Sequence, residues 1–413
     1  MTTSFDRMWA DLQPVGRHEG TGGYRRYAWT RTDDDLREWF AAECRARGLA
    51  VVEDRAGNQW AWWGDPDTTP GVVIGSHLDS VPDGGAFDGP LGVVSALAVV
   101  DDLRAAGVET PDIPLGVVNF VDEEGARFGV ACAGSRLITG ELDADRARGL
   151  ADGDGVTMAE AWQKAGRDPA AMGPDPEAVR RIGRFVELHI EQGKALALAP
   201  DGTDDLSDDA RAVAIGTDIW PHGRWRIDLP GEANHAGTTR LEDRRDAMIA
   251  LADVVHAARS YATALGCVAT VGKLVVEPGG VNAVPSHVTA WLDARGRSEH
   301  AVRAVVEAVG ADAMRTGGET TIESWTPPTT FHAGLVDELR AVLPDAPLLG
   351  TGAGHDAGIL ATHGVPSAML FVRNPTGVSH SPKESAYLDD CHHGVSALTA
   401  VVSALTTRKD TPR

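Results

Sequence analysis

Histidine and carboxylate side chains follow apolar runs in several segments of this 413-residue chain. The first segment reads GSHLDSVPDGGAFDGPLG, and it places His77 and Asp79 two residues apart, with Asp88 in the Gly-rich stretch that follows. Residues i and i+2 of a strand point to the same face, so the first two side chains could converge. A single buried histidine is more often a hydrogen-bonded core residue than a metal ligand, so this segment needs support from others.

A second segment, NFVDEEGARFG, places Asp122, Glu123 and Glu124 in a row after the apolar run IPLGVVNFV. Adjacent acidic side chains repel one another, and such a run usually lies on a solvated surface. At the end of a buried strand the repulsion would instead require a cation, which a divalent metal ion would supply.

Two further histidines complete the pattern. His189 in VELHIEQG shares a strand face with Glu187 and Glu191, and His380 in NPTGVSHSPKE follows the apolar run PSAMLFV. Each alone is typical of a surface histidine. Together the segments offer imidazole and carboxylate ligands without thiolate, which suits Zn²⁺, Mn²⁺, Co²⁺ or Ni²⁺ in a hydrolytic site. Two such ions about 3.5–4 Å apart could share a carboxylate and a hydroxide.

The elements that must position these residues follow the spacing of an α/β fold. A buried strand over residues 70–76, an apolar helix over 89–106 and a second buried strand over 113–121 predict a largely parallel sheet. Open sheets of this kind place their sites at the C-terminal ends of the strands. Other strands and helices of this part are predicted over residues 33–47, 184–190, 366–372 and 384–405.

A second pattern occupies residues 211–325, where the predicted order βαββαβ is that of a ferredoxin-like sandwich. We expect it to be a domain inserted between two parts of the first, residues 1–210 and 326–413. The helix predicted over 244–264 should bury one apolar stripe. That stripe consists of Met248, Leu251, Ala252 and Val255.

Composition narrows the class of protein. The net charge of -22 argues against nucleic acid or an anionic membrane as a partner. The sequence has neither an apolar run of membrane-spanning length nor a signal-peptide pattern in MTTSFDRMWADLQ, so a cytoplasmic location is predicted. The four cysteines show no CxxC spacing, and reduced thiols are expected.

At these motifs the chain closely resembles the dinuclear-metal aminoacylase/carboxypeptidase superfamily, and within it the branch of allantoate amidohydrolase, N-carbamoyl-L-amino-acid hydrolase and β-alanine synthase. The resemblance covers nearly the whole chain. Its motifs are GSHLDSVPDGGAFDGPLGV, DEEGARFG, ELHIEQG, GEANHAGTT, GGVNAVP, LDARG, GAGHDA and SHSPKE. It implies a mixed, largely parallel sheet flanked by helices in a metallopeptidase-like catalytic domain. The inserted ferredoxin-like βαββαβ domain would be a lid and the surface of a homodimer.

The resemblance also implies a metal centre with two divalent ions per subunit. Zinc is preferred, with manganese, cobalt and nickel as alternatives. His77 and His189 would bind one ion, Glu124 and His380 would bind the other, and Asp88 would bridge both.

Further roles are implied for residues around the metal centre. Glu123 would be the general base that takes a proton from the metal-bound water and passes it to the leaving nitrogen, and Asp79 would orient His77. His235 would stabilise the oxyanion and could reach the partner subunit's site, while Arg295 would hold a substrate carboxylate. Other substrate-binding candidates are Asn282, Gln192, His222, Gly354 and His355. Plain structural roles compete with these, such as a turn residue for Asn282 and a helix cap for His355.

The implied reaction is hydrolysis of the ureido group of a small carboxylated substrate, allantoate or an N-carbamoyl-L-amino acid, with release of ammonia and carbon dioxide. Allantoate is preferred because EEGARF and GAGHDA are similar to that subgroup. After HAGTT this sequence reads RLEDRRDAM, where many carbamoylases carry a Pro-Met pair. This difference leaves the identity of the substrate's side chain undetermined. An aminoacylase or dipeptidase would release an amino acid instead of ammonia. A non-catalytic metal-binding or regulatory protein would lack a ligand or the base, whereas every position is filled here.

Overall fold

The computed structural model describes residues 3–199, 202–206 and 211–408, which belong to two compact units. Unit 1 comprises Met1–Thr217, Thr330–Leu349 and Gly354–Arg413, and unit 2 comprises Asp218–Thr329 and Gly350–Ala353. The chain therefore leaves unit 1, builds nearly all of unit 2, and returns.

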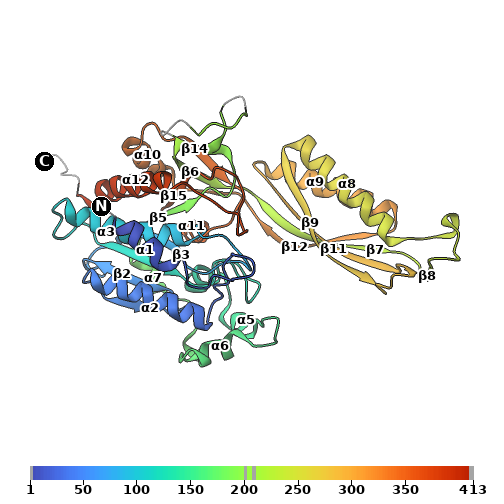
Figure 1. Ribbon diagram of the computed structural model, residues 1–413, viewed down its shortest axis with the longest axis horizontal. Coiled ribbons are helices and arrows are strands. Elements are labelled where there is room, and N and C mark those ends of the chain that lie inside the picture. The colour runs from blue at the N-terminus through green and yellow to red at the C-terminus, as the bar shows by residue number, and fades with distance from the viewer. Residues whose placement is uncertain (1–2, 200–201, 207–210, 409–413) are drawn as a thin grey trace. The chain divides into compact units, whose positions relative to one another are not determined.

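Unit 1 is built around a nine-stranded mixed sheet with the order β1-β2-β4-β3-β5-β15-β6-β13, and β14 pairs with β6 (Figure 1). Its four central strands are parallel, namely β4 (Leu115–Phe120), β3 (Gly71–His77), β5 (Ile182–Ile190) and β15 (Ser367–Val372). Strands β3, β4 and β15 are buried along their whole length on both faces, which explains their nearly continuous apolar sequences. The outer strands are β1 (Val51–Glu53), β2 (Gln59–Trp63), β6 (Val213–Ile219), β13 (Thr329–Thr330) and β14 (Leu348–Thr351).

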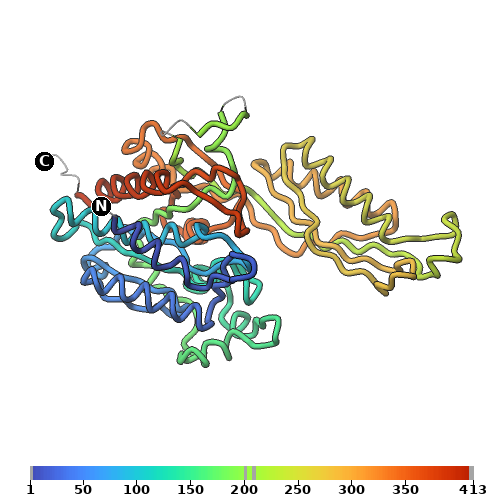
Figure 2. The backbone as a smooth tube through the Cα atoms, viewed as in Figure 1, coloured from blue at the N-terminus to red at the C-terminus, as the bar shows by residue number. Residues whose placement is uncertain are grey.

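Helices cover both faces of this sheet. On one face α3 (Pro90–Ala105) packs on β3, β4 and β5, and α12 (Leu388–Thr406) packs on α3 and β15. On the other face α11 (Asp356–Thr362) packs on β5 and β15, with α4 (Ala133–Thr139) beside it. The N-terminal helix α1 (Ser4–Leu12) lies beside α12 (Figure 2), where Asp6 and His392 are hydrogen-bonded. Further α-helices in the described part of unit 1 are α2 (Arg31–Ala46), α5 (Ala144–Gly149), α6 (Met158–Lys164), α7 (Pro176–Arg180) and α10 (Ala333–Val342).

Unit 2 is a ferredoxin-like sandwich, as the sequence predicted. The chain runs βαββαβ, and the four-stranded antiparallel sheet has the order β12-β7-β11-β9. Its helices cover one face of the sheet, where residues such as Ile227, Leu292 and Val305 form the core. The elements are β7 (His222–Pro230), α8 (Ala247–Leu265), β9 (Cys267–Glu277), β11 (His287–Gly296), α9 (Glu299–Arg315) and β12 (Glu319–Thr326), with a ribbon of β8 (Asn234–His235) and β10 (Ala283–Val284).

The helix predicted over 244–264 is present as α8, but the predicted buried stripe was wrong. Leu251 is buried, whereas Met248 is 38% exposed and Val255 is 41% exposed. Ala252 is exposed as well. The buried face is lined instead by small side chains, which let the helix lie close to its neighbours. It consists of Ala247, Ala250, Leu251, Val254, Ala258 and Ala262.

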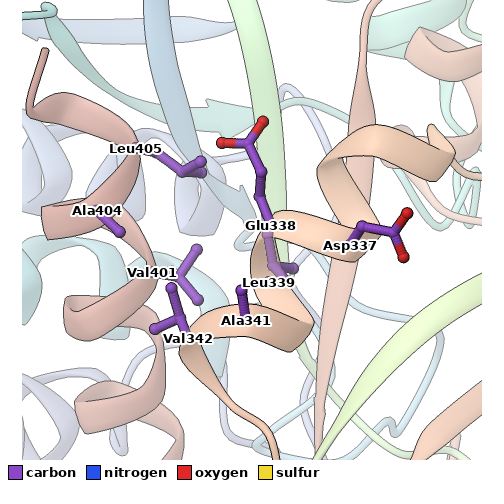
Figure 3. A pocket seen from close by; sticks show the side chains of 8 residues that line it. All are labelled: Asp337, Glu338, Leu339, Ala341, Val342, Val401, Ala404 and Leu405. Atoms are coloured by element: carbon purple, nitrogen blue, oxygen red, sulfur yellow. The ribbon is translucent and has the colours of Figure 1, made fainter. Parts of the chain in front are cut away.

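A pocket of about 380 Å³ lies between α10 and α12 (Figure 3). Its walls are mainly apolar side chains such as Leu339 and Val401, and Asp337 and Glu338 supply its acidic groups.

No helix in the described ranges has both the length and the apolar character needed to cross a membrane. All four cysteines are free thiols, as expected from their spacing. The cytoplasmic location stays a prediction.

Candidate metal centre

The C-terminal ends of the four central strands bring the predicted ligands of unit 1 together. His77 is the last residue of β3, and His189 lies one residue before the end of β5. Glu123 and Glu124 follow β4, and His380 lies in the loop after β15. Parallel neighbours end at the same edge of a sheet, so side chains far apart in sequence converge here.

Asp88 occupies the centre of this group and divides its two oxygens between two sets of residues. Its Oδ1 lies 3.6 Å from Nε2 of His77 and 3.1 Å from Nε2 of His189. Its Oδ2 lies 3.4 Å from Nε2 of His380. Gly89 follows with a φ of 83°, and a Cβ there would lie 2.4 Å from the His77 ring, so only glycine fits at this turn.

The side chains fit a pair of cations that share Asp88. His77, Asp88 and His189 could hold one metal ion, and Asp88, Glu124 and His380 could hold another. Within the described residues, Nε2 of His77 and Nε2 of His189 are buried without a hydrogen-bond partner. Tetrahedral ligands with bonds of about 2.1 Å lie roughly 3.4 Å apart, which is close to the separations around Asp88.

In both His77 and His189 the second ring nitrogen has a partner, which orients the ring. Nδ1 of His77 lies 3.2 Å from the backbone oxygen of Asp79, and Nδ1 of His189 lies 2.9 Å from that of Ile190. When Nδ1 carries the proton and donates it to these oxygens, Nε2 keeps its lone pair for a metal ion.

The Asp79 carboxylate holds three groups of the site at once. Its Oδ1 accepts the backbone N–H of Glu123 over 3.1 Å, and its Oδ2 accepts that of Glu124 over 3.0 Å. Its Oδ1 also lies 3.4 Å from Nδ1 of His77. Asp79 therefore fixes the backbone after β4 as well as the His77 ring.

The pKa values of the ligand side chains are strongly shifted by their mutual proximity. Burial alone would raise the pKa of Asp88, but the neighbouring histidines, His189 first, hold it well below its usual value. Burial and the Asp88 charge raise the pKa of Glu124 to about 7. The hydrogen bond to Asp88 raises the pKa of His380 to about 9. A divalent cation would compensate the buried negative charge of this cluster.

Glu123 stands beside these ligands and is 6% exposed. Its Oε2 lies 3.6 Å from Nε2 of His77, and its Oε1 accepts a hydrogen bond from Sγ of Cys132 over 3.3 Å. Burial raises the pKa of Glu123 well above its usual value, although the nearby His77 opposes the shift. A carboxylate with a raised pKa can accept a proton near neutral pH.

Three of the predicted substrate residues belong to unit 1. Gln192 donates from Nε2 to Oδ2 of Asp88 over 2.8 Å. Gly354 is exposed, and His355 is buried with its ring centroid 4.5 Å from that of His189. Burial, followed by the charge of His189, holds the pKa of His355 well below its usual value. His355 is the N-cap residue of α11, but its side chain makes no capping hydrogen bond.

The other predicted substrate residues belong to unit 2. His235 is exposed in β8, where it pairs with Ala283 of β10, and Asn282 precedes that strand. His222 and Arg295 are cross-strand partners in β7 and β11. Their substrate roles stay predictions.

Several residues that shape the site were not singled out in the sequence. Oε1 of Glu384 accepts the backbone N–H of Phe87 and of Asp88 over 2.8 and 3.0 Å, so this carboxylate supports the loop that carries Asp88. Asp293 binds Arg295, and Cys132 binds Glu123. Glu384 lies within SHSPKE, but nothing in that motif reveals which backbone it contacts.

Comparisons with known proteins agree with this arrangement. Peptidase family M20/M25/M40 matches residues 73–404. An N-carbamoyl-L-amino acid amidohydrolase of Geobacillus stearothermophilus is 36% identical over 95% of this chain and 96% of that protein. An allantoate amidohydrolase of Bacillus subtilis is 30% identical over 93% of both chains. The crystal structure of a hydantoinase/carbamoylase family amidase from Burkholderia ambifaria superposes with a TM-score of 0.78 at 32% identity, covering 97% of this chain and 96% of that one.

Proposed function

We propose, since the chain belongs to peptidase family M20/M25/M40, that it is a metal-dependent amidohydrolase that cleaves a linear amide in a ureido substrate. The observation that carries the proposal is the division of the Asp88 oxygens between two sets of ligands. A hydrogen-bonded core would not leave two buried imidazole nitrogens, Nε2 of His77 and of His189, without partners beside one carboxylate oxygen.

Two divalent ions per subunit fit this arrangement, with zinc preferred and manganese, cobalt or nickel as alternatives. His77, His189 and Asp88 would hold one ion, and Asp88, Glu124 and His380 would hold the other. When bound, such ions polarise a carbonyl group and make water more acidic.

The side chains around this centre supply the proton transfer. Glu123 accepts a proton from the attacking water and then delivers it to the leaving nitrogen, which its raised pKa favours. Asp79 holds the backbone of Glu123 and the ring of His77, so the base and a ligand share one support. Gln192, Gly354 and His355 are proposed to contact the substrate.

Arg295 of unit 2 is proposed to bind the substrate carboxylate. Its Nε and Nη2 donate to Asp293 over 2.7 and 3.0 Å, and its Nη1 donates to the backbone oxygen of Gly352 over 2.9 Å. A guanidinium has five N–H groups, so these bonds leave one N–H each on Nη1 and Nη2 for a carboxylate. Asn282, His222 and His235 are proposed to assist in substrate and oxyanion binding.

The substrate is proposed to be an N-carbamoyl-L-amino acid or allantoate. The relatives named above include both activities, and the N-carbamoyl-L-amino acid amidohydrolase shares more identical positions with this chain than the allantoate amidohydrolase does. This difference favours the N-carbamoyl substrate over the preference that the motifs alone gave.

A homodimer through unit 2 is also proposed. The exposed apolar side chains Met248, Ile249 and Val255 on α8 support it, together with the unpaired edge of β9.

The deciding experiment measures ammonia release by the metal-loaded protein. Allantoate, several N-carbamoyl-L-amino acids, ureidoglycolate and N-acetyl-amino acids are offered in parallel. We expect ammonia from one ureido substrate, and we expect a chelator to abolish its release. Hydrolysis of only the acetylated or peptide substrates would reject the ureido activity in favour of an aminoacylase or dipeptidase.

A substitution tests the base. Glu123→Gln should lower kcat by about 10²–10⁴-fold while metal content and folding are kept, because the amide cannot accept the proton. Glu177→Gln, at a side chain that is 73% exposed on α7, serves as the matched control. Full activity of Glu123→Gln would reject the proposed mechanism.

A further inference from the structure

Cys132 departs from two local preferences at once. Its φ is 54°, in the left-handed region where a residue with a Cβ is strained. It is also the N-cap residue of α4, yet its side chain makes no capping hydrogen bond. Glycine or asparagine suits a left-handed backbone. Serine, threonine, aspartate or asparagine suits a helix N-cap. Cysteine meets neither requirement, which points to a contact that only its side chain makes.

That contact is with the proposed base. Sγ of Cys132, a residue only 2% exposed, donates to Oε1 of Glu123 over 3.3 Å. Within the described ranges this is the single side-chain hydrogen bond to the Glu123 carboxylate. The other oxygen, Oε2, faces His77. The two oxygens of Glu123 are therefore divided between a thiol and the metal-ligand side of the site.

The backbone holds the two residues in fixed positions. The backbone N–H of Cys132 donates to the carbonyl oxygen of Glu123 over 2.5 Å. The next two N–H groups, of Ala133 and Gly134, donate to Asp122 and Val121 over 3.1 and 3.0 Å. The first turn of α4 thus binds the chain where it leaves β4. These bonds fix the backbone of Cys132, from which the thiol side chain extends, relative to Glu123.

We propose that Cys132 is a positioning residue for Glu123, and that its thiol holds Oε1 so that Oε2 is directed toward the metal centre. The proposal rests on the proposed role of Glu123 as the base. A thiol is a weak donor, so it orients the carboxylate while leaving it free to exchange a proton. Without the thiol the Glu123 side chain gains freedom at its rotatable bonds, and fewer of its orientations are productive.

Substitution by glycine separates this role from a structural one. Cys132→Gly removes the thiol and also removes the strain at φ 54°, so the thermal midpoint should stay the same or rise. If Cys132 positions the base, kcat should fall by about 10- to 100-fold with little change in KM and in bound metal. Cys132→Ser keeps a donor and should recover most of the lost kcat. Cys44→Ala, at a buried thiol in α2, controls for loss of a buried thiol as such.

The outcomes distinguish the proposals. A Cys132→Gly enzyme with the parent's kcat would overturn the positioning role. If the glycine variant fails to fold, Cys132→Ser is compared with Cys132→Ala, and equal kcat values for these two variants would overturn the role as well. Glu123→Gln is measured in parallel. If it is inactive while Cys132→Gly is fully active, only the positioning role fails. If it is active, the proposed base fails first.

Discussion

At the scale of single residues, the site depends on carboxylates that hold the candidate ligands and the proposed base in position. Asp79 binds two backbone N–H groups and lies against His77, so its removal should disturb the proposed base and a proposed ligand together. We expect Asp79→Asn to lower metal affinity by about 10- to 100-fold and also to lower kcat. Metal titration and steady-state kinetics would measure both effects, with Asp337→Asn as an exposed control. Unchanged metal affinity would show that Asp79 does not hold His77.

The meeting of the candidate ligands could be predicted from sequence, because His77, Glu124, His189 and His380 each lie at or beyond the C-terminal end of a buried strand. Strand alternation and parallel pairing then place them at one edge. The contact of Cys132 with Glu123 could not be predicted in this way. It depends on the conformation of the loop between β4 and α4, including two left-handed residues other than glycine, and no periodicity encodes that.

At the scale of elements, helix periodicity predicted α8 but not which face it buries. An alanine-rich face packs inward, and larger side chains remain outside, because close approach of a helix requires small residues. Antiparallel strands with mixed aromatic sequence, such as β2, also escaped prediction because their apolar pattern is short.

The exposed side of α8 leads to a prediction about assembly. Sedimentation should show a dimer, and the double variant Ile249→Glu with Val255→Glu should be monomeric, because it would place charges in the proposed apolar interface. Val52→Glu, at an exposed edge-strand valine of unit 1, is the matched control. A monomeric parent protein would contradict the proposed dimer, and dissociation caused only by Val52→Glu would move the interface elsewhere.

At the scale of the whole molecule, buried acids and histidines link stability to pH. Burial raises the pKa of Glu384 to about 7 and that of Asp356 to about 8, and the hydrogen bond to Asp88 raises that of His380 to about 9. Each group binds protons more tightly in the folded state than in the unfolded state. Between about pH 6.5 and 9 the free energy of unfolding of the metal-free protein should therefore fall as pH rises.

Urea unfolding in the presence of a chelator would measure this trend. Added metal should stabilise the protein more at pH 9 than at pH 6.5, since fewer protons then compete for the ligands. A midpoint that rises with pH in the metal-free protein would show that these groups are not protonated in the fold.

The order of the sheet also bears on how a ribosome makes this protein. Strand β15 pairs beside β5, and His380 lies beyond it, so a growing chain lacks a central strand of unit 1 and a candidate ligand until the residues after unit 2 have been made. Residues 218–329, by contrast, carry nearly all of unit 2 in one stretch. Unit 2 can therefore fold while unit 1 still lacks β15. During that time the edge of β5 that pairs with β15 has no partner strand, and chaperones or another strand could bind it.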